Sequence, residues 1–201
     1  MVDKKLETIK YYDQEATSWS ASHGGDEKES WWKDEVVRFN EYLPGGRVLE
    51  IGSGVGKDAR ALINLGYDYV GTDASSGLLE LAKERNPSAT FIQKYIHEIE
   101  PSLGKFDGFW ASAVLLHIPK DEILDSLLAI SSILESGGIG FITMKEGTGE
   151  RVDEKTGRLF TYYQEDEFTK VLESVGFSVL EVERRNTKND NWLIYYVRKE
   201  D

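Results

Sequence analysis

The sequence has no cysteine among its 201 residues. This absence excludes disulfide bonds, zinc sites built on thiolate ligands and catalysis by a thiol nucleophile. Histidine is scarce as well, with three residues, and they form no clear ligand cluster with the acidic residues. The sequence therefore predicts no metal site.

Positive charge is also in short supply. The chain has 24 Lys and Arg against 36 Asp and Glu, a formal net charge of −12. Proteins that bind the phosphate backbone need a basic surface, so no nucleic-acid partner is expected. Apolar runs are far shorter than the roughly 18 to 20 residues of a membrane span, and Asp3 and Glu7 lie where a signal peptide would be apolar. We expect a soluble, cytoplasmic protein with no membrane partner.

The length suits one domain over residues 1–201, because no internal repeat or low-complexity tract suggests a second one. Near the N-terminus, apolar side chains recur at steps of three and four residues: Leu6, Ile9, Tyr12, Ala16 and Trp19. This spacing predicts an amphipathic helix or a pair of helical turns. A second helix is expected from a cap at Ser30 to Leu43, with at least one of Trp31 and Trp32 in the core and the other either in the core or lining an acceptor pocket. Residues 1–43 thus form a helical cap and residues 44–201 the core.

From Val48 onward, short apolar segments alternate with helical patterns, which is typical of an α/β fold with a doubly wound, mostly parallel sheet. Strands are expected at residues 48–51, 69–73, 90–96, 106–111 and 139–144, with a closing antiparallel pair at 177–185 and 192–198. Helices are expected at residues 57–65, 75–85, 121–134 and 165–175, the third of them capped by Asp121.

Three glycines follow the first of these strands at every second position: Gly52, Gly54 and Gly56. They predict a tight turn that no side chain obstructs, with bare amides at a helix N-terminus that favours carboxylate or phosphate. An ordinary tight loop is the alternative. A dinucleotide site spaces its glycines G-x-G-x-x-G. Here the third glycine comes one residue early, and Lys57 occupies the position that the third glycine has in a dinucleotide site. We therefore expect no binding of NAD or NADP.

An acid, Glu50, precedes this turn, and a second acid, Asp73, ends the next strand, where it is placed to take both ribose hydroxyls of a nucleotide. The Glu-x-Gly-x-Gly-x-Gly arrangement resembles motif I of the class I S-adenosylmethionine-dependent methyltransferases. Later segments resemble those of a small bacterial-type subgroup of that family, in the same order and along nearly the whole chain. The resemblance implies a seven-stranded Rossmann-like sheet with an antiparallel last strand, and S-adenosyl-L-methionine as cofactor. It places the cofactor against Glu50, Gly52, Ser53, Gly54, Gly56, Asp73, Ala74, Tyr95, Ile96 and Ala111. The family usually has an acid where this chain has Tyr95, which puts a side-chain contact to adenine in doubt.

Three segments distant in sequence are expected to surround the methyl acceptor: His117, Tyr12 and the region of Glu146. His117 is a candidate general base, or else a structural residue that bonds a carbonyl. Tyr11–Tyr12–Asp13 resembles the element that closes over the cofactor in small methyltransferases, although aromatic docking of a helix gives the same pattern. Residues 147–158 form either a mobile lid or a plain solvated loop. His23 and His97 are expected at the surface.

The run from Ala111 to Val114 lacks the Asn/Asp-Pro-Pro-aromatic motif of enzymes that methylate exocyclic amines of bases. The expected activity is in-line methyl transfer from S-adenosylmethionine to an O, N or S atom of a small molecule, by a monomer or weak homodimer. The alternative is a non-catalytic S-adenosylmethionine-binding or regulatory module, which would share every cofactor motif. The sequence does not name the acceptor.

Overall fold

The computed structural model describes residues 4–22 and 32–201, and one mixed sheet runs through this part of the chain. Its first five strands are β1 (Arg47–Ile51), β2 (Asp68–Asp73), β3 (Thr90–Gln93), β4 (Phe106–Ala111) and β5 (Leu134–Glu146). They run parallel in the order β3-β2-β1-β4-β5. The chain leaves β1 toward one side and returns to pair β4 on the other, so a crevice forms at their carboxyl ends.

Two further strands close the sheet: β8 (Phe177–Asn186) and β9 (Asn191–Lys199). β9 runs antiparallel to both β5 and β8. The main sheet therefore reads β3-β2-β1-β4-β5-β9-β8, with β9 as its antiparallel member. This confirms the predicted doubly wound α/β fold with an antiparallel last strand.

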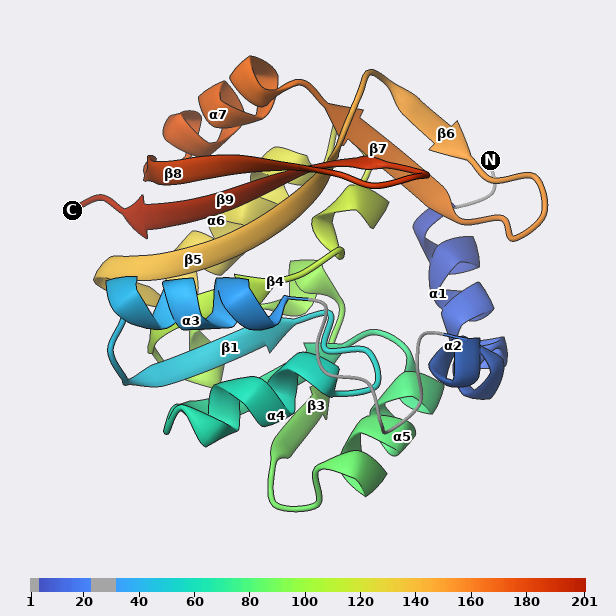
Figure 1. Cartoon of the computed structure of the whole chain (residues 1–201), viewed down its shortest axis with the longest axis horizontal. Coiled ribbons are helices and arrows are strands. Elements are labelled where there is room, and N and C mark those ends of the chain that lie inside the picture. The colour runs from blue at the N-terminus through green and yellow to red at the C-terminus, as the bar shows by residue number, and fades with distance from the viewer. Residues whose placement is uncertain (1–3, 23–31) are drawn as a thin grey trace.

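Seven α-helices are described: α1 (Lys4–Gln14), α2 (Ala16–Ser22), α3 (Lys33–Tyr42), α4 (Lys57–Asn64), α5 (Ser76–Arg85), α6 (Ile123–Ile133) and α7 (Glu165–Ser174). The predicted pair of N-terminal helical segments is confirmed. α3 lies in front of the sheet and α6 behind it, while α1 and α2 lie off the end toward which β1 points (Figure 1). The expectations for His23, Ser30 and Trp31 fall outside the described residues.

Residues 147–158 hold the first strand and the turn of a β-hairpin, where either a mobile lid or a plain solvated loop was expected. β6 (Glu150–Val152) pairs antiparallel with β7 (Leu159–Tyr163), and β7 continues the sheet beside the end of β5. The tip of the hairpin is fixed by Asp153, whose carboxylate accepts hydrogen bonds from the amide and hydroxyl of Thr156 at 3.0 and 2.8 Å. Such an Asx-type turn orders a charged, glycine-rich stretch without any apolar core.

Three predicted boundaries are wrong. β3 ends at Gln93 rather than at residue 96, because the Glu98 carboxylate accepts the Tyr95 amide at 2.8 Å and diverts the chain into the 3-10 turn η1 (Ile96–Glu98). α6 begins at Ile123 without a side-chain cap from Asp121. β5 begins directly at Leu134, with its pairing to β4 shifted past Phe106.

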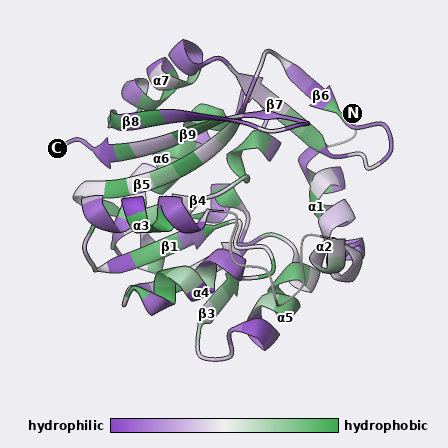
Figure 2. Cartoon of the chain, in the orientation of Figure 1, coloured by the Kyte–Doolittle hydropathy of each residue, from purple (hydrophilic) through white to green (hydrophobic). Residues whose placement is uncertain are grey.

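The core lies along the centre of the sheet, where β1, β4 and residues 138–144 of β5 are mostly buried and mostly hydrophobic (Figure 2). Trp110 of β4 stacks on Phe141 of β5 with ring centroids 3.6 Å apart, and Phe39 of α3 packs edge-on against Trp110. Trp32 is buried against Phe141 and Trp192 and therefore belongs to the core. Among the helices of the described residues, none is long and apolar enough to cross a membrane.

Candidate functional site

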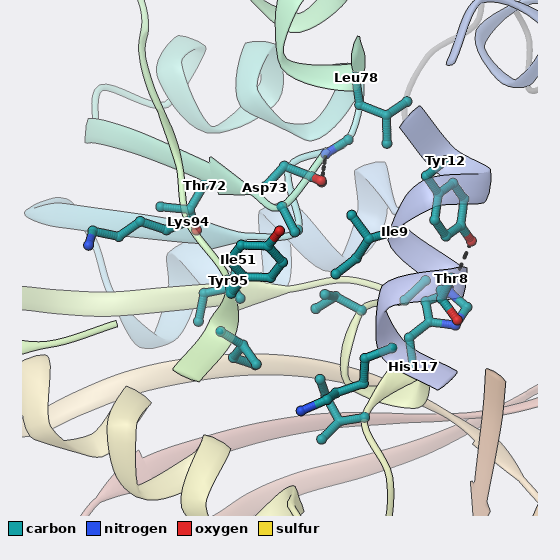
Figure 3. Close-up of a pocket in the computed structure, with 18 of the residues that line it drawn as sticks. Thr8, Ile9, Tyr12, Ile51, Thr72, Asp73, Leu78, Lys94, Tyr95 and His117 are labelled. Atoms are coloured by element: carbon teal, nitrogen blue, oxygen red, sulfur yellow. Dashed lines mark hydrogen bonds between the residues drawn. The ribbon is translucent and has the colours of Figure 1, made fainter. Parts of the chain in front are cut away.

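A cavity of about 280 Å³ lies at the carboxyl ends of β1, β2 and β4, beneath α1. Its two ends differ in chemistry: Asp73, Lys94 and Tyr95 lie on one side, and Tyr12 and His117 meet on the α1 side (Figure 3). The remaining lining residues come from α1, α2, the glycine turn, the ends of β1 and β2, α5, the 3-10 turn after β3 and the segment after β4: Lys5, Leu6, Thr8, Ile9, Trp19, Ile51, Gly52, Gly54, Thr72, Ala74, Leu78, Ile96, His97, Ile99, Ser112, Ala113, Val114 and Ile118.

The three glycines of the turn all have positive φ, at 70°, 52° and 69° for Gly52, Gly54 and Gly56. A Cβ on Gly54 would meet nothing within 4 Å, so the backbone there is open to a ligand. A Cβ on Gly52 would lie 2.5 Å from Val114 Cγ2, and one on Gly56 would lie 2.6 Å from Asn86 Nδ2. The first two glycines line the cavity, whereas the third provides close packing against α5.

Gly52→Ala is expected to destabilise the protein more than Gly54→Ala. Both alanines take a left-handed backbone conformation, at a cost of about 1–2 kcal/mol, but only the first also overpacks Val114, which adds about 1–3 kcal/mol. Urea unfolding of the two variants measures the difference. Val114→Ala should recover part of the loss in the Gly52→Ala background, and equal stabilities of the two single variants would contradict this packing argument.

Asp73 ends β2 and uses both carboxylate oxygens on the neighbouring backbone. Oδ2 accepts the Gly54 amide at 2.8 Å, and Oδ1 accepts the Ser75 amide at 2.9 Å. Burial raises the pKa of Asp73, and these amide hydrogen bonds oppose the rise. Each carboxylate oxygen can accept more than one hydrogen bond, so Asp73 ties the glycine turn to β2 and still presents acceptors to the cavity.

Asp13, at the end of α1, holds this helix over the cavity. Its Oδ1 accepts the amide of Gly77 at 2.8 Å and the hydroxyls of Ser75 and Ser76 at 2.9 and 3.1 Å. The Gly77 amide, followed by the two hydroxyls, lowers the pKa of Asp13. The negative charge lies at the N-terminus of α5, where the helix dipole stabilises it. Sequence reasoning missed this role, since nothing in the local pattern pairs residue 13 with residue 77.

His117 and Tyr12, which both line the cavity, form a hydrogen-bonded pair. His117 Nδ1 lies 2.6 Å from the Leu159 carbonyl oxygen, which is only an acceptor, so Nδ1 carries the proton. Nε2, 2.9 Å from the Tyr12 hydroxyl, therefore accepts the Tyr12 proton. Burial lowers the pKa of His117 to about 4, helped by the charges of Arg158 and Lys145. The imidazole is thus neutral throughout the physiological pH range, and the lone pair of Nε2 accepts the hydrogen bond from Tyr12.

This depressed pKa makes stability depend on pH. Above about pH 6.5, the ordinary pKa of histidine, His117 is neutral in both the folded and the unfolded chain. Below that pH the unfolded chain binds a proton at His117, whereas the folded chain binds it only near pH 4. We expect this group to remove about 2 kcal/mol of stability between about pH 7.5 and pH 5. Urea unfolding at both pH values should show the extra loss in the wild type and not in His117→Gln. Equal pH slopes in the two proteins would contradict it.

Four predicted cofactor residues do not line the cavity: Glu50, Ser53, Gly56 and Ala111. Glu50 is buried under the turn, where it accepts a hydrogen bond from Tyr69, and burial together with the charge of Asp58 raises its pKa well above the usual range. The Ser53 hydroxyl is buried with no hydrogen-bond partner in the described part of the chain. Ala111 is buried within the sheet, opposite Ile142 of β5.

Glu146 is the predicted acceptor residue that the structure does not bring to this cavity. Its carboxylate accepts Arg184 Nε at 3.0 Å and faces a separate, polar surface hollow. Thr8 and Ile9 line the cavity without having been predicted; their place on the same helix as Tyr12 was the only available signal. Over residues 4–22 and 32–201, no group of three or more His, Asp or Glu side chains is arranged to hold a metal ion.

Comparison with known proteins places this site in a wider context. Residues 48–138 match a family model described as a methyltransferase domain. Phosphoethanolamine N-methyltransferase 2 of Caenorhabditis elegans is 32% identical over 127 residues, 59% of this chain and 28% of that protein. Magnesium-protoporphyrin O-methyltransferase of Rhodobacter capsulatus is 30% identical over 129 residues, 56% of this chain and 58% of that protein. The matches thus span less than two thirds of either relative.

A solved structure shows the same fold over nearly the whole chain. Magnesium protoporphyrin IX methyltransferase from Synechocystis PCC 6803, with bound S-adenosylhomocysteine, superposes with a TM-score of 0.80 at 19% identity. The superposition covers 98% of this chain and 100% of that one. At this level of identity the likeness establishes the fold, and the chemistry of the site has to be argued from its own residues.

Proposed function

The chain contains a methyltransferase domain in the class I fold, and from that premise we propose that it transfers a methyl group from S-adenosyl-L-methionine to a small-molecule acceptor. One observation carries the proposal: a single cavity joins the open glycine turn and Asp73 at one end to the Tyr12–His117 pair at the other. The first end suits a nucleoside, and the second lies where an acceptor would approach the methyl group.

At the nucleoside end, each residue has a proposed task. Asp73 accepts the ribose hydroxyls, and the backbone of Gly52 and Gly54 lies against the methionine portion, where no side chain intervenes. Tyr95 and Ile96 line the place expected for adenine. The buried Glu50, Ser53, Gly56 and Ala111 support this surface from beneath and do not contact the ligand directly.

At the acceptor end, the cofactor supplies an activated sulfonium methyl group, so the protein mainly has to align the acceptor with it. The acceptor lone pair would form the new bond to the methyl carbon as the carbon–sulfur bonding pair returns to sulfur, and an acceptor that carries a proton would release it to solvent. Tyr12 is the proposed point of contact, and His117 acts through it as a positioning residue. Glu146, paired with Arg184 outside the cavity, has no part in this step.

Two relatives of the chain are named as N- and O-methyltransferases, so the acceptor atom is not fixed by similarity. The net charge of −12 supports a small-molecule acceptor over nucleic acid. The same charge and the small size of the domain support the proposal of a cytoplasmic monomer or weak homodimer.

A thermal-shift assay tests cofactor choice. S-adenosylhomocysteine at 100 times its dissociation constant should stabilise the native state by about 2.7 kcal/mol, while NAD at equal concentration should leave the melting temperature unchanged. A shift with NAD alone would overturn the assignment.

A second assay separates an enzyme from a non-catalytic binding module, which would give the same thermal shift. Incubation with S-adenosylmethionine and mixtures of small acids, amines and phenols, followed by detection of S-adenosylhomocysteine, should show acceptor-dependent product. Tight binding with no product from any mixture would favour the module.

A further inference from the structure

Arg158, the last residue of the turn between β6 and β7, lies beside the acceptor end of the cavity. Its guanidinium carbon is 4.9 to 5.5 Å from the ring centroids of Tyr11, Tyr12, Trp19 and Phe160. Nη1 donates a hydrogen bond to the Tyr12 hydroxyl at 3.1 Å, and Nε donates to the Thr156 hydroxyl at 3.2 Å. Tyr12 and Trp19 themselves line the cavity, so a fixed positive charge stands directly behind its wall.

No carboxylate of the described residues forms an ion pair with Arg158, although the chain carries 36 acidic residues. Two acidic side chains of the same hairpin have other partners. Glu150 accepts the amide of Lys120 at 2.7 Å and pairs with Lys4, and Asp153 holds the hairpin tip. A half-buried guanidinium bound only to two neutral hydroxyls retains N–H donors and most of its charge for another partner.

Two positive charges, Arg158 and Lys145, act on His117, and both disfavour its protonation. Lys145 pairs with Asp190 at 2.9 Å, whereas no carboxylate of the described residues pairs with Arg158. Asp73 is the acidic residue that lines the cavity; it lies on the same side as Lys94 (Figure 3), and its charge also acts on Tyr12. The guanidinium of Arg158 is therefore the charge at the Tyr12–His117 end that a bound anion would balance, in a protein whose overall charge is strongly negative.

We propose that the acceptor is an anion, carrying a carboxylate whose charge is balanced by Arg158 at the Tyr12–His117 end of the cavity. This inference rests on the proposed function and narrows its substrate class. Arg158 lies behind Tyr12 and Trp19 and is not among the residues that line the cavity, so its fixed charge acts on the carboxylate across the Tyr12 hydroxyl, to which Nη1 donates at 3.1 Å. The aromatic rings around Arg158 hold the guanidinium in place and exclude water from it, which strengthens its effect on a nearby anion.

Benzoate and benzamide are a matched probe pair, of equal shape and different charge. With S-adenosylhomocysteine saturating, NMR titration of the wild type should show benzoate binding about tenfold or more tightly than benzamide. Arg158→Gln should abolish this preference, and Arg158→Lys should keep part of it. Arg151→Gln is the control: Arg151 belongs to the same hairpin and lies 5.8 Å from the Phe160 ring, but it is exposed. Its removal should leave the preference unchanged.

Several outcomes would overturn the inference. Equal affinity of the wild type for benzoate and benzamide would overturn it, even if Arg158→Gln fails to fold. A preference for benzoate that is retained in Arg158→Gln would overturn it as well. The cofactor's own carboxylate is the other possible partner of Arg158. If Arg158→Gln weakens S-adenosylhomocysteine binding but not binding of 5′-methylthioadenosine, which lacks the amino-acid portion, Arg158 serves the cofactor and not the acceptor. Failure of the wild type to bind S-adenosylhomocysteine at all would instead refute the proposed function.

Discussion

Asp73→Ala should weaken binding of S-adenosylhomocysteine by about 10- to 150-fold, because charge-assisted hydrogen bonds of about 1.5–3 kcal/mol to the ribose are lost. The structure adds a second reason for a large effect. Asp73 also holds the Gly54 amide at 2.8 Å, so its removal releases the turn against which the ligand would lie. Isothermal titration calorimetry measures the affinity, and Asp73→Asn should lose less because it keeps one acceptor oxygen.

Asp68→Ala is the matched control, since Asp68 begins the strand that Asp73 ends and is exposed at the far side of the sheet. Among the described residues, its ion pair is with Arg47, at 3.4 Å. It should bind S-adenosylhomocysteine as the wild type does. A folded Asp73→Ala variant with unchanged affinity would remove Asp73 from the site.

Tyr12→Phe and His117→Gln should each lower turnover by about 100-fold or more once an acceptor is known, within the usual range for loss of acid–base or positioning groups. The hydroxyl of Tyr12 and Nε2 of His117 share one hydrogen bond of 2.9 Å, so removing either partner disables the other. Initial-rate kinetics measures turnover, with affinity for S-adenosylhomocysteine measured alongside and expected to be unchanged by His117→Gln.

The double variant decides whether the two residues act as a unit. Residues that act together give non-additive losses, so Tyr12→Phe/His117→Gln should be little worse than the poorer single variant. Tyr42→Phe is a control for Tyr12→Phe, because Tyr42 does not line the cavity and its hydroxyl donates to Glu181 at 2.6 Å; its turnover should match the wild type. Near-normal turnover of His117→Gln would show that His117 only shapes the segment after β4.

The fold was largely predictable because its signals are local. The run of apolar residues before Gly52, the acid at residue 73 and the alternation of strand and helix each depend on neighbours within a few positions. The seven strands with an antiparallel last one came from resemblance; the antiparallel pairing of β9 with β5 and β8 confirms the last strand, and β6 and β7 bring the sheet to nine strands. The hairpin at 147–158 was missed because Asp153 and Thr156 create order through side-chain hydrogen bonds, which leave no apolar periodicity in the sequence.

The site was predictable only in part. Asp73, the first two glycines and the meeting of Tyr12 with His117 follow from the rule that ligands lie at the carboxyl ends of strands. The tautomer of His117 depends on the Leu159 carbonyl, 42 positions away, and its low pKa depends on burial. Glu146 was misplaced relative to the cavity because a residue at the end of a strand can face either side, and here Arg184 draws it outward.

A crystal structure with S-adenosylhomocysteine tests the central claim most directly. The account predicts the ligand in the cavity beneath α1, with both ribose hydroxyls within hydrogen-bonding distance of the Asp73 carboxylate and the sulfur facing Tyr12 and His117. A ligand bound elsewhere, or one in the cavity whose sulfur faces away from the Tyr12–His117 pair, would contradict it.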